Sequence, residues 1–195
     1  MCGRYYVDDG TVREIEKLVS QIDRKLLEEK GRDVFPSQSA PVVTGRDGDL
    51  MGEALIWGFP GFEKARVIFN ARQETALEKR TFRESVRLRR CVIPARHFYE
   101  WDKKKEKYTF TRQDNRVLYL AGCYDRFGED DRFVILTTEA NDSMKKIHDR
   151  MPVVLEERQI EEWIFDSRKT EAILSQPVVE LNSKTEYEQV TLDLF

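Results

Sequence analysis

Apolar side chains recur with helical spacing near the start of the chain. Over residues 11–30 they lie three or four positions apart. The stripe consists of Ile15, Leu18, Val19, Ile22, Leu26 and Leu27. Asp8 and Asp9 stand where polar side chains cap a helix, and Gly31 stands where a helix commonly stops. The pattern predicts one long helix that packs its stripe into the core.

After residue 39 the apolar runs become short and are separated by turn residues, which is typical of strands. Residues 40–44 and 50–57 flank Arg46-Asp47-Gly48-Asp49 and predict a hairpin. Further strands are expected at residues 91–94, 98–101, 108–111, 117–124, 133–138 and 153–155. The short connections between many of these runs indicate antiparallel pairing.

The remaining segments predict loops and short helices. Residues 34–38 and 58–62 are expected to be irregular, since proline or glycine interrupts them. The aromatic residues of the second loop, Phe59 and Phe62, are candidates for stacking on bases or for a hydrophobic corner, and Phe59 favours the corner. Thr81 and Glu84 have the spacing of a capping box.

That capping box predicts a helix through residue 89, with Arg83, Arg87 and Arg90 on one face. Other helices are expected at about residues 142–147, 156–165 and 169–174. The predicted fold class is α+β, a single domain over residues 1–195 with mainly an antiparallel sheet or open barrel flanked by helices.

Composition narrows the class of protein. With 195 residues and 40% hydrophobic content, the chain can bury a sizeable core. Three cysteines, an odd number without metal-ligand spacing, argue against a disulfide framework and favour a reducing compartment. We therefore expect a cytoplasmic protein, associated with the nucleoid if bacterial, without membrane segment, metal or cofactor.

The charge is unevenly distributed. The net charge is −3, yet residues 64–107 hold 14 Lys and Arg against 6 Asp and Glu, a local charge of +8. Such asymmetry fits a face that binds a polyanion, and it fits equally a solvated face of a highly charged chain.

Cys2 is the first candidate for chemistry. Removal of Met1 would leave an N-terminal cysteine whose amine and thiol titrate near ~8 and ~8.5, so that both are partly deprotonated at neutral pH. Such a residue can condense with an aldehyde and close to a thiazolidine, or attack an acyl carbon as N-terminal nucleophile hydrolases do. The alternative is a small buried residue in a strand, the commoner state of a free cysteine.

Four other polar side chains stand beside apolar or aromatic segments. Asn70 can orient a carbonyl or amine and Arg72 can grip a phosphate, or the two can cap a turn and pair with Glu74. Glu100 lies among aromatic residues that would raise its pKa towards proton transfer, or it is an exposed strand glutamate. His148 is a loop proton shuttle or a helix cap.

Together these segments resemble the SOS response-associated peptidase (SRAP) family, whose members shield abasic sites in single-stranded DNA. The resemblance extends from residue 2 to about residue 165, and its motifs occur in the family's order. They are Met1-Cys2-Gly3-Arg4, Trp57-Gly58, Asn70-Ala71-Arg72-Gln73-Glu74-Thr75, Arg90-Cys91-Val92-Ile93-Pro94, Phe98-Tyr99-Glu100-Trp101, Thr137-Thr138-Glu139-Ala140-Asn141 and His148-Asp149-Arg150-Met151-Pro152.

The resemblance implies a thiazolidine crosslink between mature Cys2 and the open-chain aldehyde of an abasic deoxyribose. By motif, Asn70 positions the cysteine, Glu100 shuttles protons during imine formation, and His148 assists opening of the sugar ring and reversal of the crosslink. The family's peptidase label refers to self-removal of Met1 or of a short extension, although an aminopeptidase can suffice here.

The resemblance also implies a basic channel for DNA, in which Arg4 and Arg72 hold flanking phosphates while Pro36 and Trp57 shape the channel near the bases. The expected partner is single-stranded DNA with abasic sites, at replication forks or junctions, and we expect a monomer. The alternative functions are an N-terminal-cysteine peptidase acting on proteins and a non-covalent reader of single-stranded DNA.

Two positions depart from the family pattern. Arg32-Asp33 stand ahead of Pro36 where the family usually has Tyr-Asn, so a carboxylate replaces an amide. Phe59-Pro60-Gly61-Phe62 replaces the usual Leu-Ile-Pro-x-Trp after Trp57-Gly58. Both departures affect the expected base stacking and junction preference and leave the reaction centre intact.

Overall fold

The computed structural model describes residues 2–28, 30–61, 63 and 66–185. The strands are β1 (Tyr5–Val7), β2 (Gln21–Ile22), β3 (Arg32–Val34), β4 (Ser39–Arg46), β5 (Asp49–Trp57), β6 (Phe59–Pro60), β7 (Val67–Ile68), β8 (Asn70–Arg72), β9 (Arg90–Ala95), β10 (His97–Trp101), β11 (Lys107–Arg112), β12 (Leu118–Phe127), β13 (Asp130–Glu139), β14 (Arg150–Pro152), β15 (Val154–Leu155) and β16 (Leu181–Thr185). The α-helices are α1 (Asp9–Leu18), α2 (Gln73–Ala76), α3 (Arg83–Leu88), α4 (Ile160–Phe165) and α5 (Thr170–Leu174). The 3₁₀ helices are η1 (Arg24–Glu28), η2 (Glu157–Gln159) and η3 (Ser167–Lys169).

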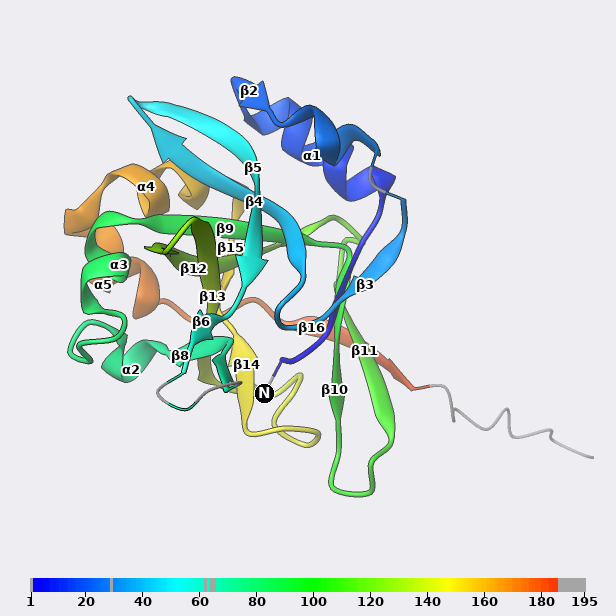
Figure 1. Cartoon of the computed structure of the whole chain (residues 1–195). Coiled ribbons are helices and arrows are strands. Elements are labelled where there is room, and N and C mark those ends of the chain that lie inside the picture. The colour runs from blue at the N-terminus through cyan, green and yellow to red at the C-terminus, as the bar shows by residue number, and fades with distance from the viewer. Residues whose placement is uncertain (1, 29, 62, 64–65, 186–195) are drawn as a thin grey trace, which may run out of the picture.

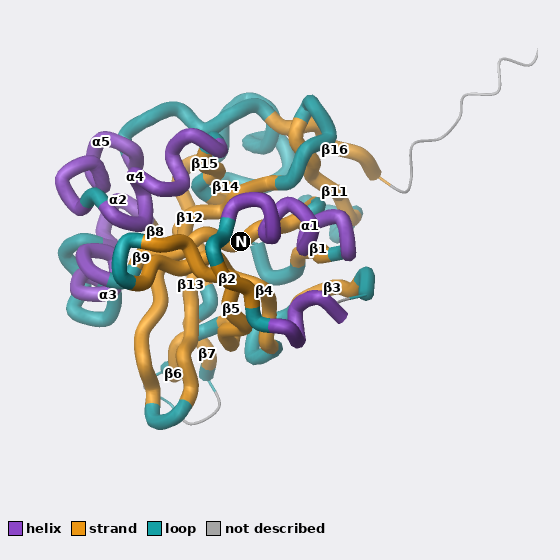
Figure 2. The backbone as a smooth tube through the Cα atoms, turned by 90° about the horizontal axis from the view of Figure 1, so that it is seen from above, coloured by secondary structure: helices purple, strands orange, loops and turns teal. Residues whose placement is uncertain are grey.

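These elements confirm the predicted α+β class. One sheet has the order β16-β11-β10-β1-β3, and a larger one has the order β14-β13-β12-β9-β4-β5-β2 (Figure 1). Most neighbours are antiparallel, as expected, but β2 pairs with β5 in parallel, and β5 and β8 pair with β13 in parallel. Helices α2 to α5 gather on one flank of the sheets, and α1 lies apart from them (Figure 2).

The single long helix predicted over residues 11–30 is wrong in its second half. Asp8 caps α1 as expected, but the helix ends at Leu18, and Val19 is extended. Ser20 N–H then bonds to the carbonyl of Leu50 at 2.9 Å, and β2 pairs with β5. The edge of β5 binds this backbone while Val19 and Ile22 pack against the core, so tertiary pairing overrides the helical spacing.

The predicted hairpin is confirmed as β4 and β5, in register from Ser39 opposite Ile56 to Arg46 opposite Asp49. Its two turn residues, Asp47 and Gly48, both have positive φ, at 53° and 91°. This backbone matches the right-handed twist of a two-residue hairpin.

Three other predictions need correction. Phe82 rather than Thr81 caps α3, without a side-chain bond, and Arg90 is buried in β9, bonded to backbone carbonyls that include Trp163. Residues 142–147 form successive turns instead of a helix. Residues 58–62 contain the short strand β6, in which Phe59 is buried against Phe82 and Phe127, while Phe62 lies outside the described residues.

Trp57 is the point at which distant segments meet. Its buried ring lies 5.0 Å from the ring of Tyr5 and stacks on Phe133 at 6.3 Å. Gly58 follows with φ of 109°, and a Cβ there would stand 2.1 Å from a Val67 methyl. Only glycine therefore fits the second position of this Trp-Gly pair.

Candidate functional site

Backbone pairing fixes the segment that carries Cys2. The strand β1 lies between β3 and β10, with Tyr5 opposite both Val34 and Phe98. One residue earlier, the carbonyl of Arg4 accepts a bond from Tyr99 N–H at 3.0 Å. The thiol of Cys2 is 3.9 Å from the same carbonyl. The residues before β1 therefore follow the edge of β10 towards Glu100.

Cys2 is buried, with 1% of its surface exposed, and it belongs to a hydrophobic cluster with Tyr5 and Trp57. Burial first, and then the charge of Glu100, raise the pKa of its thiol well above the ordinary value. In this structure the thiol is therefore less deprotonated than a free cysteine, because desolvation disfavours the thiolate.

Glu100 is also buried, with 4% exposure, so the exposed alternative for this residue is wrong. It points to the same side of β10 as Phe98, whereas Trp101 is exposed on the other side. Glu100 directly follows Tyr99, whose N–H bonds to the Arg4 carbonyl that the Cys2 thiol also contacts, so the two side chains belong to the same part of the site. The structure thus joins a buried carboxyl and a buried thiol from segments almost a hundred residues apart.

Asn70 completes this group. Its amide nitrogen donates a bond of 2.9 Å to the carbonyl of Cys2. The preceding carbonyl, of Phe69, accepts a bond of 2.8 Å from the Trp57 indole, which holds the start of β8 in place. The Asn70 side-chain oxygen is buried without a hydrogen-bond partner among the described residues. It is an acceptor available for an amine or hydroxyl that enters the site.

His148 is connected to the group through Arg150. The Nδ1 atom of His148 accepts a bond of 3.0 Å from Arg150 N–H and is 2.9 Å from an Asp149 carboxylate oxygen. A neutral ring satisfies the first contact and a protonated ring the second, so both protonation states have a partner. The Arg150 guanidinium grips Glu74 through two bonds of 2.7 and 2.9 Å, which link the His148 loop to α2.

The ion pair between Arg150 and Glu74 also bears on the role of Arg72. The sequence left open an ion pair between Arg72 and Glu74, but the carboxylate of Glu74 binds Arg150. The bonds from Arg150 are the main reason why the pKa of Glu74 lies below its usual range. Arg72 is exposed at the end of β8, two residues after Asn70. Its charge therefore lies at the surface beside the Cys2 group.

Arg4, Pro36 and Trp57 differ in their access to solvent. Arg4 forms an ion pair with Asp33 and lies over two aromatic rings, whereas Pro36 is half-buried in a loop tied to Trp57 by a 2.7 Å bond from Ser37 N–H. Trp57 itself has 0% exposure. The resemblance implies that Trp57 shapes a channel near the bases, and a fully buried ring can do so by supporting the site from the core side.

Only some of the cations in the basic segment, residues 64–107, are exposed and free of ion pairs among the described residues. Arg89 pairs with Glu84 and Asp125, Arg90 is buried, and Lys64 lies outside the described residues. Two groups of exposed cations have no ion pair among the described residues. From β8 to α3 they are Arg72, Lys79, Arg80, Arg83 and Arg87, and in the β10–β11 turn they are Lys103, Lys104 and Lys105. The positive charge that can meet a polyanion is therefore concentrated in these two stretches.

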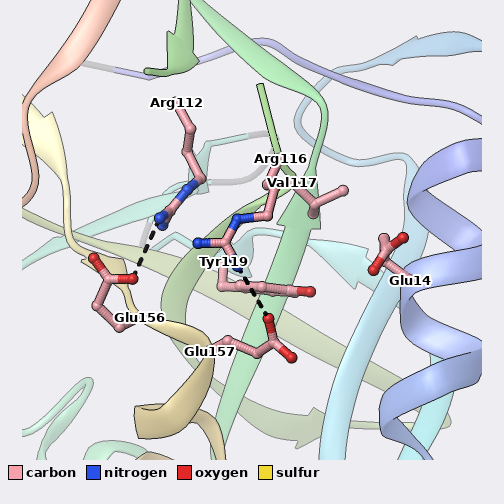
Figure 3. Close-up of a pocket in the computed structure, with 7 residues that line it drawn as sticks. All are labelled: Glu14, Arg112, Arg116, Val117, Tyr119, Glu156 and Glu157. Atoms are coloured by element: carbon pink, nitrogen blue, oxygen red, sulfur yellow. Dashed lines mark hydrogen bonds and ion pairs between the residues drawn. The ribbon is translucent and has the colours of Figure 1, made fainter. Parts of the chain in front are cut away.

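A separate small cavity of about 20 Å³ lies elsewhere (Figure 3). It is lined by Glu14, Arg112, Arg116, Val117, Tyr119, Glu156 and Glu157. Arg112 pairs with Asp114 and Glu156, and Arg116 with Asp114 and Glu157, so each cation is already matched. The volume suffices for about one water molecule. We interpret this cavity as the centre of an ion-pair network that joins the β11–β12 turn to η2.

Within the part of the chain that the structure describes, no three His, Cys, Asp or Glu side chains converge on a point that could hold a metal ion. Nor does that part contain a helix with the length and apolarity needed to cross a bilayer.

Sequence reasoning missed three residues of this site. Asp33 forms an ion pair with Arg4, and the N–H of Tyr99 bonds to the Arg4 carbonyl. Arg150 forms an ion pair with Glu74. The sequence did offer signals for all three residues. Tyr99 and Arg150 lie within the motifs that resemble the family, and Asp33 lies where the sequence departs from the family pattern. Their partners could not be inferred, because each contact joins segments brought together only by the sheets.

Comparisons of the sequence with a family model and with known proteins all find the same family. The family model of the SOS response associated peptidase matches residues 1–193. The abasic site processing protein YoaM of Bacillus subtilis is 32% identical over 184 residues, 84% of this chain and 79% of that protein. YedK of Escherichia coli, also named an abasic site processing protein, is 30% identical over 176 residues with the same two coverages.

A solved structure of a protein from Bacteroides thetaiotaomicron shares the fold, with a TM-score of 0.79. It is 23% identical and covers 94% of this chain and 91% of its own. Since the family model spans nearly all residues and two relatives reach 30% identity or more over most of their length, the chain belongs to the SOS response associated peptidase (SRAP) family.

Proposed function

We propose that this protein recognises abasic sites in single-stranded DNA and binds them covalently through Cys2 after removal of Met1. The observation that carries the proposal is the convergence of Asn70 and Glu100 on Cys2, a residue that becomes N-terminal when one methionine is lost. The names of the relatives YoaM and YedK support an abasic site as the target.

The proposed reaction has two bond-forming steps. The Cys2 amine attacks the aldehyde carbon of the ring-opened deoxyribose, and loss of one water molecule gives an imine. The thiol then adds to the imine carbon, its proton passes to the nitrogen, and a five-membered thiazolidine results. Nothing is oxidised or reduced, so the reaction needs no cofactor.

The side chains around Cys2 fit separate parts of this sequence. Asn70 holds the Cys2 carbonyl, and its free oxygen can accept a bond from the neighbouring amine. Glu100, buried beside the thiol, can protonate the departing hydroxyl and accept the thiol proton. These roles need proximity, which a buried pair provides without long side-chain movements.

His148 and Arg72 fit the DNA side of the reaction. His148 has partners for both protonation states, as a group that moves a proton during sugar opening and crosslink reversal requires. The exposed Arg72 and the cations of α3 can follow a phosphate backbone away from Cys2. Phosphate contacts carry no base information, so we expect binding with little sequence preference.

A denaturing gel tests the proposal. Single-stranded DNA with one uracil, treated with uracil glycosylase, is mixed with protein whose intact mass has been measured. We expect a heat-stable shifted band from protein that lacks Met1, and none from untreated DNA. Retained Met1 in a crosslinking sample contradicts the mechanism. Cys2→Ser should lose the stable adduct while its amine still forms an imine that borohydride traps.

The same samples separate the alternative functions. A native-gel shift without a denaturing-gel band would indicate a non-covalent reader of single-stranded DNA. Cleavage of a peptide panel that depends on Cys2, without a DNA adduct, would indicate an N-terminal-cysteine peptidase.

A further inference from the structure

Arg4 is held by three side chains from two other segments of the chain. Its guanidinium forms an ion pair with Asp33 of β3, lies 4.7 Å from the centre of the Tyr99 ring, and lies 5.2 Å from the centre of the Phe35 ring. A cation within about 6 Å of a ring face is attracted by it, and two rings leave the guanidinium little freedom.

The charge of Asp33 is set mainly by Arg4. Partial burial by itself raises the pKa of Asp33, but the hydrogen bond and charge of Arg4, with the nearby Tyr99 hydroxyl, outweigh it, so that the pKa lies below the usual range. The Tyr99 hydroxyl is also 2.8 Å from Nε2 of His97, whose ring stacks on Tyr6 at 4.8 Å. The cluster therefore extends across β3, β1 and β10.

This cluster acts directly on the segment that carries Cys2. The backbone of Arg4 is bonded to Tyr99 N–H, and its carbonyl accepts the contact from the Cys2 thiol. Arg4 is thus fixed at both its backbone and its side chain, two residues from the nucleophile. By contrast, Arg72 is exposed and has no ion pair among the described residues.

We propose that Asp33 is a positioning residue that clamps Arg4 and thereby holds Cys2 in its buried position against Asn70. Arg4 then serves the N-terminal segment rather than a DNA phosphate. The inference rests on the proposed function only for its effect on crosslinking. The position of Cys2 can be measured without DNA.

The first test is alkylation of Cys2 in Asp33→Asn, which keeps the size of the side chain and removes its charge. Iodoacetamide labelling is followed by peptide mass spectrometry. We expect Cys2 to be labelled about three- to tenfold faster than in the wild type. This factor corresponds to the loss of one partly exposed ion pair together with the ring contacts of Arg4. Cys91 and Cys123, both fully buried, should remain unlabelled and report an intact fold.

The second test separates reaction from affinity. Asp33→Asn should slow crosslinking to abasic DNA about three- to tenfold. Its affinity for DNA carrying a tetrahydrofuran analogue, which lacks the aldehyde, should not fall, and release of Arg4 should steepen the salt dependence by up to ~0.7. A purely structural defect would lower rate, affinity and thermal stability together.

Matched variants complete the experiment. Asp9→Asn removes the carboxylate of an exposed pair with Arg13 on α1 and should change neither readout. Arg4→Gln should reproduce the faster labelling of Cys2 and the slower crosslinking of Asp33→Asn, but not its steeper salt dependence, because the cation itself is gone. The double variant should label Cys2 no faster than either single variant, because both break the same unit. Wild-type labelling of Cys2 in both Asp33→Asn and Arg4→Gln overturns the proposal. A wild type that forms no crosslink overturns the proposed function instead, and the labelling still decides the role of Asp33.

Discussion

The side-chain amide of Asn70 holds the backbone carbonyl of Cys2 at 2.9 Å, although 68 residues separate them along the chain. The bond joins the start of β8 to the residues before β1, and these strands belong to different sheets. The bond orients the backbone of the proposed nucleophile from a strand of the other sheet. Loss of the bond should therefore disturb the geometry of Cys2 more than the stability of the fold.

Asn70→Ala should slow crosslinking about 5- to 150-fold, because an unpaired, buried carbonyl costs about 1–3 kcal/mol. Affinity for the tetrahydrofuran analogue should stay within about twofold, since Asn70 is not a phosphate contact. Timed denaturing gels and fluorescence anisotropy measure the two quantities. Equal losses of rate and affinity would instead place Asn70 in DNA binding.

Glu100→Gln should slow formation of the crosslink about 10²- to 10⁴-fold, the usual contribution of a general acid or base. The substitution keeps the shape of the buried side chain and removes its ability to exchange a proton. Rapid-mix gels give the rate, and thermal unfolding checks the fold. Glu106→Gln, in the β10–β11 turn, is a control that should leave the rate unchanged. A wild-type rate in Glu100→Gln would make the carboxyl a packing group.

His148→Ala should slow reversal of a preformed crosslink more than it lowers affinity. Reversal moves a proton back to the sugar, and His148 is a group with partners in both protonation states. A competitor chase of isolated crosslink, sampled over time, measures release. Equal release rates in His148→Ala and the wild type would leave His148 as a structural loop residue.

Arg72→Ala should weaken binding to all single-stranded sequences alike and flatten the salt dependence by ~0.7 for each phosphate that the variant no longer binds. The physical reason is that an exposed guanidinium releases a counterion from DNA when it binds a phosphate. Binding titrations at several salt concentrations provide the slope. Arg13→Ala, an exposed arginine on α1, is the control and should keep the wild-type slope.

The reactivity of Cys2 should rise steeply with pH. Burial raises the pKa of the thiol, so the thiolate fraction at pH 7 is smaller than in free cysteine and grows about tenfold for each pH unit. Iodoacetamide labelling of Cys2 should therefore increase through pH 9 without a plateau, whereas a free cysteine levels off above ~8.5. A plateau near pH 8 would contradict the burial of the thiol.

Several features of the protein follow from the sequence alone. The turn at Asp47 and Gly48 needs residues that tolerate positive φ, so the hairpin of β4 and β5 was predictable. Short apolar runs separated by turn residues indicated β9 to β13, and this signal is also local. The α+β class and the candidate residues Cys2, Asn70 and Glu100 could also be named before their geometry was known.

Only the tertiary structure decided what surrounds those residues. Residues 19–22 leave the helical pattern because the edge of β5 binds them, and Trp57 is buried because three segments meet on its ring. The burial that raises the pKa of Cys2 and the clamp of Asp33 on Arg4 depend on strands far apart in the chain. Local spacing determines periodicity and turns, but the field and solvent access of a side chain depend on neighbours that only packing supplies.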